Sequence, residues 1–390
     1  MKYLIQSTPI ALAILLLASC QKSIQNENLK ADNVSGLSES DRNSIASKGD
    51  NGKNFVYTLS NQTSGNEVVA YSRATDGMLT YSFSSSTGGN GTGGGLGNQG
   101  AVVKAMGNDV LLAVNPGSNS ISALKITGSG LNLKSVVNSG GMTPVSITQH
   151  GDLVYVLNAG GAGNISGFRL GINDKLTPIA NSTRPLSSMA SGAAQISFML
   201  NGTVLVITEK ATNKIITYTV DHNGVPQMMH SISSASPTPF GFATGKFGNI
   251  YVSEAVGGAP NASNVSSYHI NADGSIALIE GPVATGQSAA CWAVLTHDGS
   301  YVYTTNTASN TLSSFDVQQV SGNINLQQSI AGTTQMGPID AVLADNSNYL
   351  YILNGGGHSI SVFAVAGTGN LTHLQTITGV PVGATGLAVN

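Results

Sequence analysis

The sequence predicts an all-β protein that folds as one seven-bladed β-propeller. Three observations support this prediction: seven similar apolar runs recur every 43 to 55 residues, glycine is abundant, and the last eight residues form an isolated strand pattern. Repeats of this length are typical of propeller blades, each of which is a four-stranded sheet. With 48 glycines and 9% charged residues, the 390-residue chain suits short strands and tight turns better than helices with charged faces.

The recurring runs are rich in Val, Tyr and Ile, and we expect each to be the second strand of a blade. They cover residues 54–61, 109–115, 152–158, 203–209, 249–254, 300–306 and 348–354. Each is followed by an alternating partner strand such as 120–126 or 359–365. Six are preceded by another short strand through a tight turn. The turns include Asn201-Gly202, Asp298-Gly299 and Asp345-Asn346, residue types that tolerate the positive φ of a two-residue hairpin.

The two ends of the repeat predict how the ring closes. The first blade lacks an innermost strand, while residues 383–390 (GATGLAVN) resemble an innermost strand with no successor. We therefore expect the C-terminal strand to complete the first blade, which leaves no open central edge. Two packed β-sandwiches are the alternative. A sandwich gives no reason for a missing first strand that the last residues restore.

The N-terminal segment predicts export. Lys2 supplies a positive charge, and residues 10–17 (IALAILLL) form an apolar run too short to span a bilayer. Leu17-Ala18-Ser19-Cys20 resembles a bacterial lipobox, so we expect residues 1–19 to be a signal peptide and Cys20 to carry lipid. An ordinary secretory signal with an incidental cysteine is the alternative. Residues 20–52 are polar and read as a flexible tether, and the propeller covers 53–390.

These features define where the protein resides and which partners it meets. We expect an exported monomer that contacts the membrane only through its lipid anchor, in the bacterial outer membrane, on the periplasmic or the surface side. A formal net charge of -3 provides no basic surface for nucleic acid. The histidines are scattered and match no metal-binding motif, and we expect neither a metal nor a cofactor. Gly95, Gly97 and Gly100 fit G-x-G-x-x-G but precede a strand, so residues 87–100 read as a linker.

The last residue of each second strand is expected near the mouth of the central channel. These residues are Asn61, Asn115, Asn158, Glu209, Glu254, Asn306 and Asn354. Asparagine can bond neighbouring backbone groups and cap a turn, whereas glutamate does so poorly. Glu209 and Glu254 are therefore candidate catalytic residues that would face one shared opening. The alternative is that both are solvated, or that Glu209 pairs with Lys210 or Lys214.

The entries to the innermost strands supply the candidate ligand-binding residues. They are Gln195, Phe240, Trp292 and Asp340, to which we add Asn306 and, in the loop before the fourth innermost strand, Arg184. Trp292 is the only tryptophan, and an aromatic ring beside polar groups suits a sugar or a small cyclic ligand. It could equally fill the channel, just as Arg184 could meet an anion or lie in solvent.

The repeats at 301–317 (YVYTTNTASNTLSSFDV) and 349–365 (YLYILNGGGHSISVFAV) resemble the lactonase family of seven-bladed propellers. That family includes bacterial 6-phosphogluconolactonase and fungal carboxymuconate cyclase, and the resemblance extends over residues 54–390. It implies four site positions, occupied in family enzymes by His, Arg, Glu and Arg. Here they hold Gln195, Phe240, Glu254 and Asn306, so only the glutamate is retained. Without the arginines, a phosphorylated lactone fits poorly.

Two functions follow as hypotheses. The first is an enzyme that hydrolyses or isomerises a neutral lactone or related cyclic compound, with Glu254 as acid or base and with Glu209 and Gln195 holding the ligand. The second is a non-catalytic envelope module that binds a glycan, a peptide or a protein. A shared fold alone does not decide between them.

Overall fold

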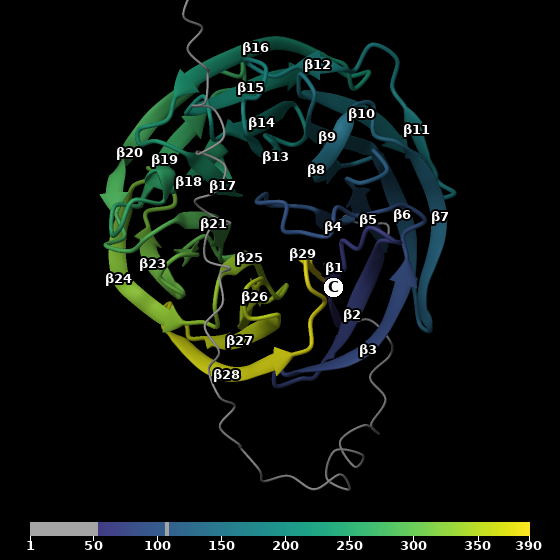
Figure 1. Ribbon diagram of the computed structural model, residues 1–390. Helices are drawn as coiled ribbons and strands as arrows, with labels where there is room; N and C mark the ends of the chain where they lie inside the picture. The colour runs from purple at the N-terminus through teal and green to yellow at the C-terminus, as the bar shows by residue number, and fades with distance from the viewer. Residues whose placement is uncertain (1–53, 106–108) are drawn as a thin grey trace, which may run out of the picture.

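A computed structural model of the protein describes residues 54–105 and 109–390, and these residues form seven antiparallel sheets arranged in a ring (Figure 1). The predicted all-β seven-bladed propeller is confirmed. The described residues contain two short 3₁₀ turns, η1 (Lys246–Gly248) and η2 (Val256–Gly258), and no longer helix. Within those two ranges, nothing helical has the length and apolarity that a membrane span requires.

The strands of each blade are given from the channel outward. Blade 1 contains β29 (Thr385–Val389), β1 (Phe55–Leu59), β2 (Glu67–Arg73) and β3 (Leu79–Ser86). Blade 2 contains β4 (Val102–Ala105), β5 (Val110–Asn115), β6 (Ser120–Thr127) and β7 (Gly130–Asn138). Blade 3 contains β8 (Met142–His150), β9 (Leu153–Gly160), β10 (Asn164–Leu170) and two outer pieces, β11 (Leu176–Pro178) and β12 (Arg184–Pro185).

The other four blades are regular. Blade 4 contains β13 (Ala193–Met199), β14 (Val204–Glu209), β15 (Lys214–Val220) and β16 (Pro226–Ser233). Blade 5 contains β17 (Pro239–Thr244), β18 (Asn249–Glu254), β19 (Asn264–Ile270) and β20 (Ile276–Ala284). Blade 6 contains β21 (Ala290–Leu295), β22 (Tyr301–Asn306), β23 (Thr311–Val317) and β24 (Ile324–Thr333). Blade 7 contains β25 (Pro338–Leu343), β26 (Tyr349–Asn354), β27 (Ser359–Val365) and β28 (Leu371–Thr378).

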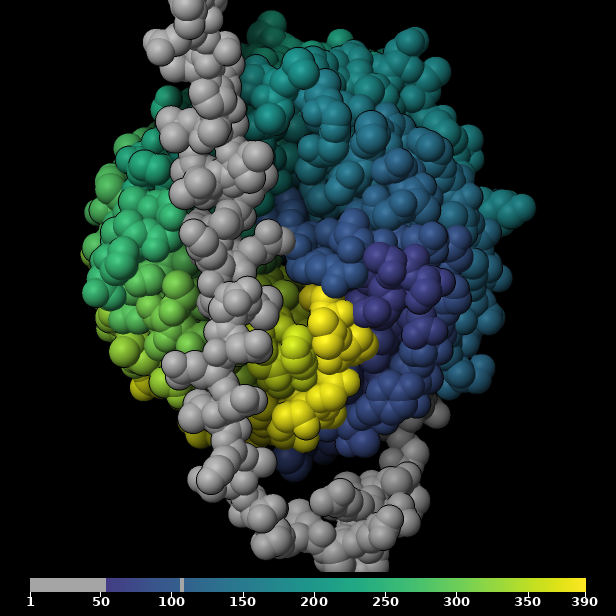
Figure 2. All heavy atoms as spheres, viewed as in Figure 1, coloured from purple at the N-terminus to yellow at the C-terminus, as the bar shows by residue number. Residues whose placement is uncertain are grey.

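The two ends of the described chain meet in blade 1, as predicted. β29 pairs antiparallel with β1, with Val389 opposite Val56. Figure 2 shows the yellow C-terminal residues in contact with the purple first strand. The Asn390 side chain accepts a hydrogen bond from the Phe55 amide at 2.7 Å, and Arg73 donates to the Asn390 carbonyl at 3.2 Å. The C-terminal strand therefore closes the ring.

Burial explains why the second strands dominate the sequence pattern. All six residues of β5, β14 and β18 are buried, because each second strand is covered on both faces by neighbouring blades. Outer strands such as β16 alternate between exposed and partly buried residues, since only one of their faces packs inward. A continuous apolar run inside each repeat therefore indicates the centre of a blade.

Tyrosines of the second strands join one blade to the next. Tyr303 donates its hydroxyl to the Gly369 carbonyl at 2.7 Å, and Tyr351 donates to the Gly77 carbonyl at 3.0 Å. Each acceptor lies in the outer turn of the following blade, so the Tyr351 bond connects the last blade to the first. Burial raises the pKa of both hydroxyls.

The predicted pairs have positive φ at two of the three turns, but each turn is longer than the two-residue hairpin, with Met199 opposite Val204 at the first of them. Asn201 and Gly202 both have positive φ, 55° and 81°, and Gly299 has φ 83°. At the third site the positive φ of 56° belongs to Ser347, one residue beyond the predicted pair. That turn has the same length as the one at Gly299, because the Ala344 amide bonds the Tyr349 carbonyl as the Thr296 amide bonds the Tyr301 carbonyl. The predicted signal peptide, Cys20 and the tether lie outside the described residues.

Candidate functional site

The glycine-rich segment of residues 88–100 crosses one end of the channel, and its interpretation as a linker was wrong. It begins at blade 1, where Asn61 donates to the Gly94 carbonyl at 2.5 Å and accepts from the Thr92 amide at 3.0 Å. It then reaches blade 4, where Lys210 donates to the Gly97 carbonyl at 2.6 Å. Glycine is required at Gly91, since an added Cβ would lie 2.1 Å from the Asn61 carbonyl carbon.

The next two residues fix the segment to blades 4 and 6, which lie on either side of blade 5. Asn98 donates to the Ala193 carbonyl at 2.6 Å and accepts from the Trp292 indole at 3.2 Å, which connects blade 4 to blade 6. Gln99 binds both backbone groups of Ala293, donating at 2.9 Å and accepting at 3.2 Å. The segment therefore covers the entries to the innermost strands of blades 4 and 6.

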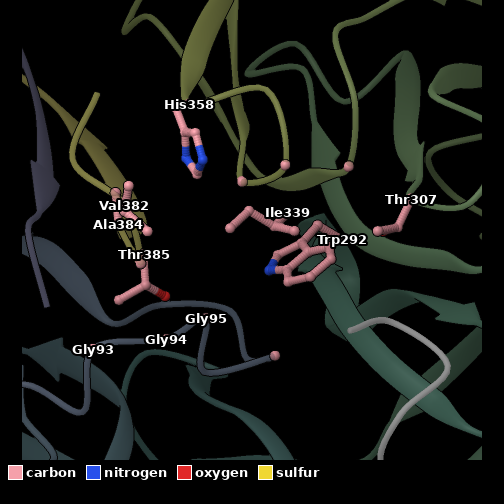
Figure 3. Close-up of a pocket in the computed structure, with 15 residues that line it drawn as sticks. Gly93, Gly94, Gly95, Trp292, Thr307, Ile339, His358, Val382, Ala384 and Thr385 are labelled. Carbon is pink, nitrogen blue, oxygen red and sulfur yellow. The ribbon is translucent and has the colours of Figure 1, made fainter. Parts of the chain in front are cut away.

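A cavity of about 360 Å³ remains beside this segment, between blades 1, 6 and 7. Its wall includes Gly93, Gly94, Gly95 and Gly97, the entries to β25 and β29, and the turns that follow β22 and β26. Figure 3 shows the His358 imidazole pointing into the space that Trp292, Ile339 and Thr385 border. None of the fifteen described lining residues is Lys, Arg, Asp or Glu. The wall is mostly apolar, and its size is typical of small-molecule pockets.

Glu254 is buried inside blade 5 and does not line the cavity. One of its carboxylate oxygens accepts from the Ser234 hydroxyl at 2.5 Å, the Ser236 amide at 3.1 Å and the Tyr268 hydroxyl at 3.1 Å. The other accepts from the Ser266 hydroxyl at 2.7 Å. Burial raises the pKa of Glu254, and these four donors oppose that shift.

Glu209 is held in the same way in blade 4. Its oxygens accept from the Ser187 amide at 2.9 Å, from the Ser187 hydroxyl and from the Thr212 hydroxyl at 2.6 Å. Among the ion pairs of the described residues, Glu209 forms none, so the alternative of a pairing with Lys210 or Lys214 is not found there. The expectation that both carboxylates face one shared opening is wrong, because each is buried among hydroxyls of its own blade and of the loop that enters that blade. Their catalytic role stays a prediction.

Gln195 and Asp340 join neighbouring innermost strands. Gln195 accepts from the Phe242 amide at 2.7 Å and donates to the Phe242 carbonyl at 3.0 Å. Asp340 accepts from the Ala341 amide at 2.8 Å and from the Leu387 amide at 3.1 Å. Burial raises the pKa of Asp340 to about 8, against the effect of the two amides. Neither side chain lines the cavity.

Trp292 is the one predicted ligand-binding residue that lines the cavity. It forms the deep part of the wall, and it packs against Phe240 with ring centroids 4.8 Å apart. Phe240 in turn lies beneath Lys210, whose Nζ is 4.5 Å from the ring centroid. The Phe240 ring therefore supports both the tryptophan and the lysine that bind the glycine-rich segment.

The side chains of Asn306 and Arg184 form hydrogen bonds away from the cavity. Asn306 is buried and donates to the hydroxyls of Thr311 at 3.1 Å and Ser313 at 2.9 Å, and not to the backbone groups expected of a turn-capping asparagine. Arg184 lies in β12 on the outer edge of blade 3 and donates to the carbonyls of Asn181 and Thr183, each at 2.9 Å. Neither residue lines the cavity. In the described ranges, no three His, Cys, Asp or Glu side chains come together as a metal site would require.

Comparison with known proteins identifies the repeat. Residues 263–385 match the model of the family described as lactonase, 7-bladed beta-propeller. The predicted resemblance to the lactonase family is confirmed. No curated protein matches the sequence significantly.

Solved structures share the fold over most of the chain. A protein from Lactobacillus plantarum is 18% identical, with a TM-score of 0.71 over 87% of this chain and 99% of that one. A Bacteroides fragilis protein proposed to be a 6-phosphogluconolactonase is 17% identical, with a TM-score of 0.68 over 88% and 100%. The periplasmic gluconolactonase of Pseudomonas aeruginosa is 14% identical, with a TM-score of 0.65 over 85% and 98%. Similarity at this level shows a common fold.

The glycine-rich segment lies over part of the region where the resemblance to the lactonase family predicts a site. Gln195 follows directly after the two alanines that Asn98 and Gln99 bind, and the Phe240 ring lies 3.8 Å from the position of a Cβ added at Gly97. The segment therefore covers the first two of the four family positions. The open cavity lies instead on blades 1, 6 and 7.

His358 is the functional candidate that the sequence analysis missed. A signal was available, because the residue four positions after the end of the second strand is Asn119, Asn213 and Asn310 in three blades and His358 in blade 7. The departure from asparagine was visible in the aligned repeats. That the side chain faces a cavity was not, since the opposite wall comes from other blades.

Proposed function

We propose that this protein is an exported cell-envelope lipoprotein whose propeller binds a small neutral cyclic compound, such as a sugar or a lactone ring, in the cavity beside the glycine-rich segment. The observation that carries the proposal is the wall itself: apolar surface from Trp292 and Ile339 lies beside the imidazole of His358. Apolar walls with a few placed polar groups are typical of pockets for small molecules.

The charge of the wall favours a neutral ligand. An anionic or cationic ligand enclosed in a mostly apolar cavity needs a charged partner, since desolvation of an unpaired ion is costly. The described lining residues supply no Lys, Arg, Asp or Glu. A phosphorylated sugar is therefore disfavoured, in agreement with the loss of both family arginines.

Trp292 makes binding directly measurable. As the only tryptophan in the chain and a part of the cavity wall, it should change its fluorescence when the cavity fills. Titration of the purified propeller with neutral lactones and sugars should give a saturable change, with a matching rise in melting temperature. A panel that changes neither quantity would contradict the proposal.

A cavity-filling variant tests whether that ligand occupies this site. Gly94 lines the cavity, has no positive φ, and a Cβ there would meet no atom within 4 Å. Gly94→Leu should therefore fold normally and abolish binding. Gly128→Leu is the matched control, because Gly128 has the same open surroundings in the outer turn of blade 2. Equal binding by both variants would place the ligand elsewhere.

Hydrolysis of a neutral lactone is the second candidate function. The match to the lactonase family over residues 263–385 favours it. Lactone opening releases an acid, so it can be followed at constant pH by the base that is consumed. Turnover that Gly94→Leu removes and Gly128→Leu retains would support chemistry in the cavity. Binding without turnover would support the non-catalytic envelope module.

The proposed anchor has its own test. Cys20→Ala should move the protein from the membrane fraction to the soluble envelope fraction, because a lipidated cysteine would be its only membrane contact. Protease treatment of intact cells would then separate a surface location from a periplasmic one. An unchanged membrane fraction for Cys20→Ala would contradict the lipoprotein assignment.

A further inference from the structure

Three blades use the same asparagine to bind the next blade. Asn119, Asn213 and Asn310 each lie four residues after the end of a second strand, with φ of 53°, 54° and 56°. Their side-chain oxygens accept from the backbone amides of Thr143, Thr238 and Gly337, at 2.7, 2.8 and 2.8 Å respectively. Each accepting bond fixes the loop that enters the following innermost strand.

His358 has the backbone of this position but not its side-chain bond. Its φ is 44°, and its carbonyl accepts from the Val380 amide at 3.1 Å, as the Asn310 carbonyl accepts from Thr334 at 2.9 Å. Asparagine tolerates a positive φ better than most residues, so the repeat itself favours asparagine here. Blade 7 carries an imidazole in its place.

The imidazole lacks a partner where one is expected. His358 Nδ1 is buried and makes no hydrogen bond within the part of the chain that the structure describes. The ring lines the cavity and points toward the space beside Trp292 and Thr385 (Figure 3). Because Nδ1 is closed to solvent, and therefore to a ligand as well, Nε2 is the ring nitrogen that can bond a molecule in the cavity, while Nδ1 keeps the cost of a buried polar atom without a partner.

We propose that His358 is the residue of this cavity that hydrogen-bonds the ligand, and that the ligand carries a hydroxyl or carbonyl oxygen on a neutral ring. This inference rests on the proposed binding function and names its specificity residue. The apolar wall would contact the carbon skeleton of the ring, and His358 would select rings with an oxygen substituent at the facing position. Blade 7 lacks the blade-to-blade bond that three other blades make at this position, and its turn lies beside the cavity.

The sharpest variant restores the residue that the repeat uses. His358→Asn should keep or raise the melting temperature, because asparagine suits the positive φ and can bind the loop that enters β29. The same variant should weaken binding of the ring compound, measured by Trp292 fluorescence, by roughly 10-fold for the loss of one buried hydrogen bond. A purely structural role for His358 predicts the reverse, a lower melting temperature with unchanged affinity.

Two controls make the outcome specific. Asn119→His creates the same residue in blade 2, away from the cavity, and should lower the melting temperature without changing affinity. A deoxy analogue that lacks the recognised oxygen should bind wild type and His358→Asn equally. If wild type binds a ring compound and His358→Asn binds it as tightly, the proposal for His358 is wrong while the binding function stands. If no ring compound binds wild type, both are wrong.

Discussion

Lys210 donates a hydrogen bond from Nζ to the carbonyl oxygen of Gly97 at 2.6 Å, across the end of the channel. The two residues are 113 positions apart, and the bond joins blade 4 to a segment that leaves blade 1. The same ammonium group lies 4.5 Å from the Phe240 ring centroid. The glycine-rich segment is thus held both by bonds to its backbone carbonyls and by the side chains of Asn98 and Gln99.

Lys210 should make stability depend on alkaline pH. Burial lowers the pKa of Lys210 from 10.5 to about 8, so between these values the unfolded chain binds more protons than the folded one. The free energy of unfolding should therefore rise as pH increases from 8 toward 10.5. Urea denaturation at pH 8 and pH 9.5 should show this rise in wild type and not in Lys210→Met. The same change in the free energy of unfolding between the two pH values in both proteins would contradict this prediction.

Asp340 should have the opposite effect at lower pH. Its pKa is raised to about 8 by burial, so the folded state holds a proton that the unfolded state releases near pH 4. Its contribution should therefore make the protein less stable as pH rises from about 4 to about 8. Comparison with Asp340→Asn over this range isolates the effect from the histidines. A wild-type curve that runs parallel to the variant curve would show that Asp340 titrates normally.

Glu254→Gln separates a structural from a catalytic role. Replacement of one carboxylate oxygen by an amide removes an acceptor for buried hydroxyls, so we expect a loss of roughly 1–3 kcal/mol in the free energy of unfolding. Any lactone turnover should be measured on the folded variant at low temperature. A general acid or base accounts for about 100-fold or more, so a fall of that size would support catalysis by Glu254. Retained turnover would exclude it, and Glu209→Gln provides the matched comparison.

The tyrosine contacts between blades should contribute to ring closure. Tyr351→Phe removes the bond from blade 7 to the Gly77 carbonyl and should lower the free energy of unfolding by about 1 kcal/mol. Tyr81→Phe is a suitable control, since that ring lies on the outer surface and is 57% exposed. Chemical denaturation of the two variants would measure the difference. Equal midpoints would show that this hydroxyl contributes nothing.

The architecture could be predicted because the apolar runs and turn residues that define a blade all lie within one repeat. The buried second strands appear in the sequence as continuous apolar runs. Each of them pairs with strands that are adjacent to it in the sequence. Closure by the last strand was also predictable, since the first blade lacked one strand and the chain end supplied one. The third hairpin shifted by one residue, because turn types differ little in composition.

The surroundings of the candidate site residues could not be predicted from the repeat. Trp292 does line a cavity, and its role in binding stays a prediction. Glu209 and Glu254 face serine, threonine and tyrosine hydroxyls that lie up to 22 residues away along the chain. A carboxylate at the end of a strand can turn inward or outward, and only its neighbours decide. The glycine-rich segment read as a linker because its contacts are with the backbones of distant blades.

The sequence by itself determined that seven similar sheets form and that the C-terminus completes the first, because hydrophobic periodicity and turn residues act within each repeat. Only the tertiary structure decided which end of the channel is filled, which carboxylates are enclosed, and that His358 faces a cavity. Each of these depends on side chains and carbonyls from blades that are far apart in the chain. The closed ring brings them within hydrogen-bonding distance, and the sequence pattern within a single repeat does not predict such contacts.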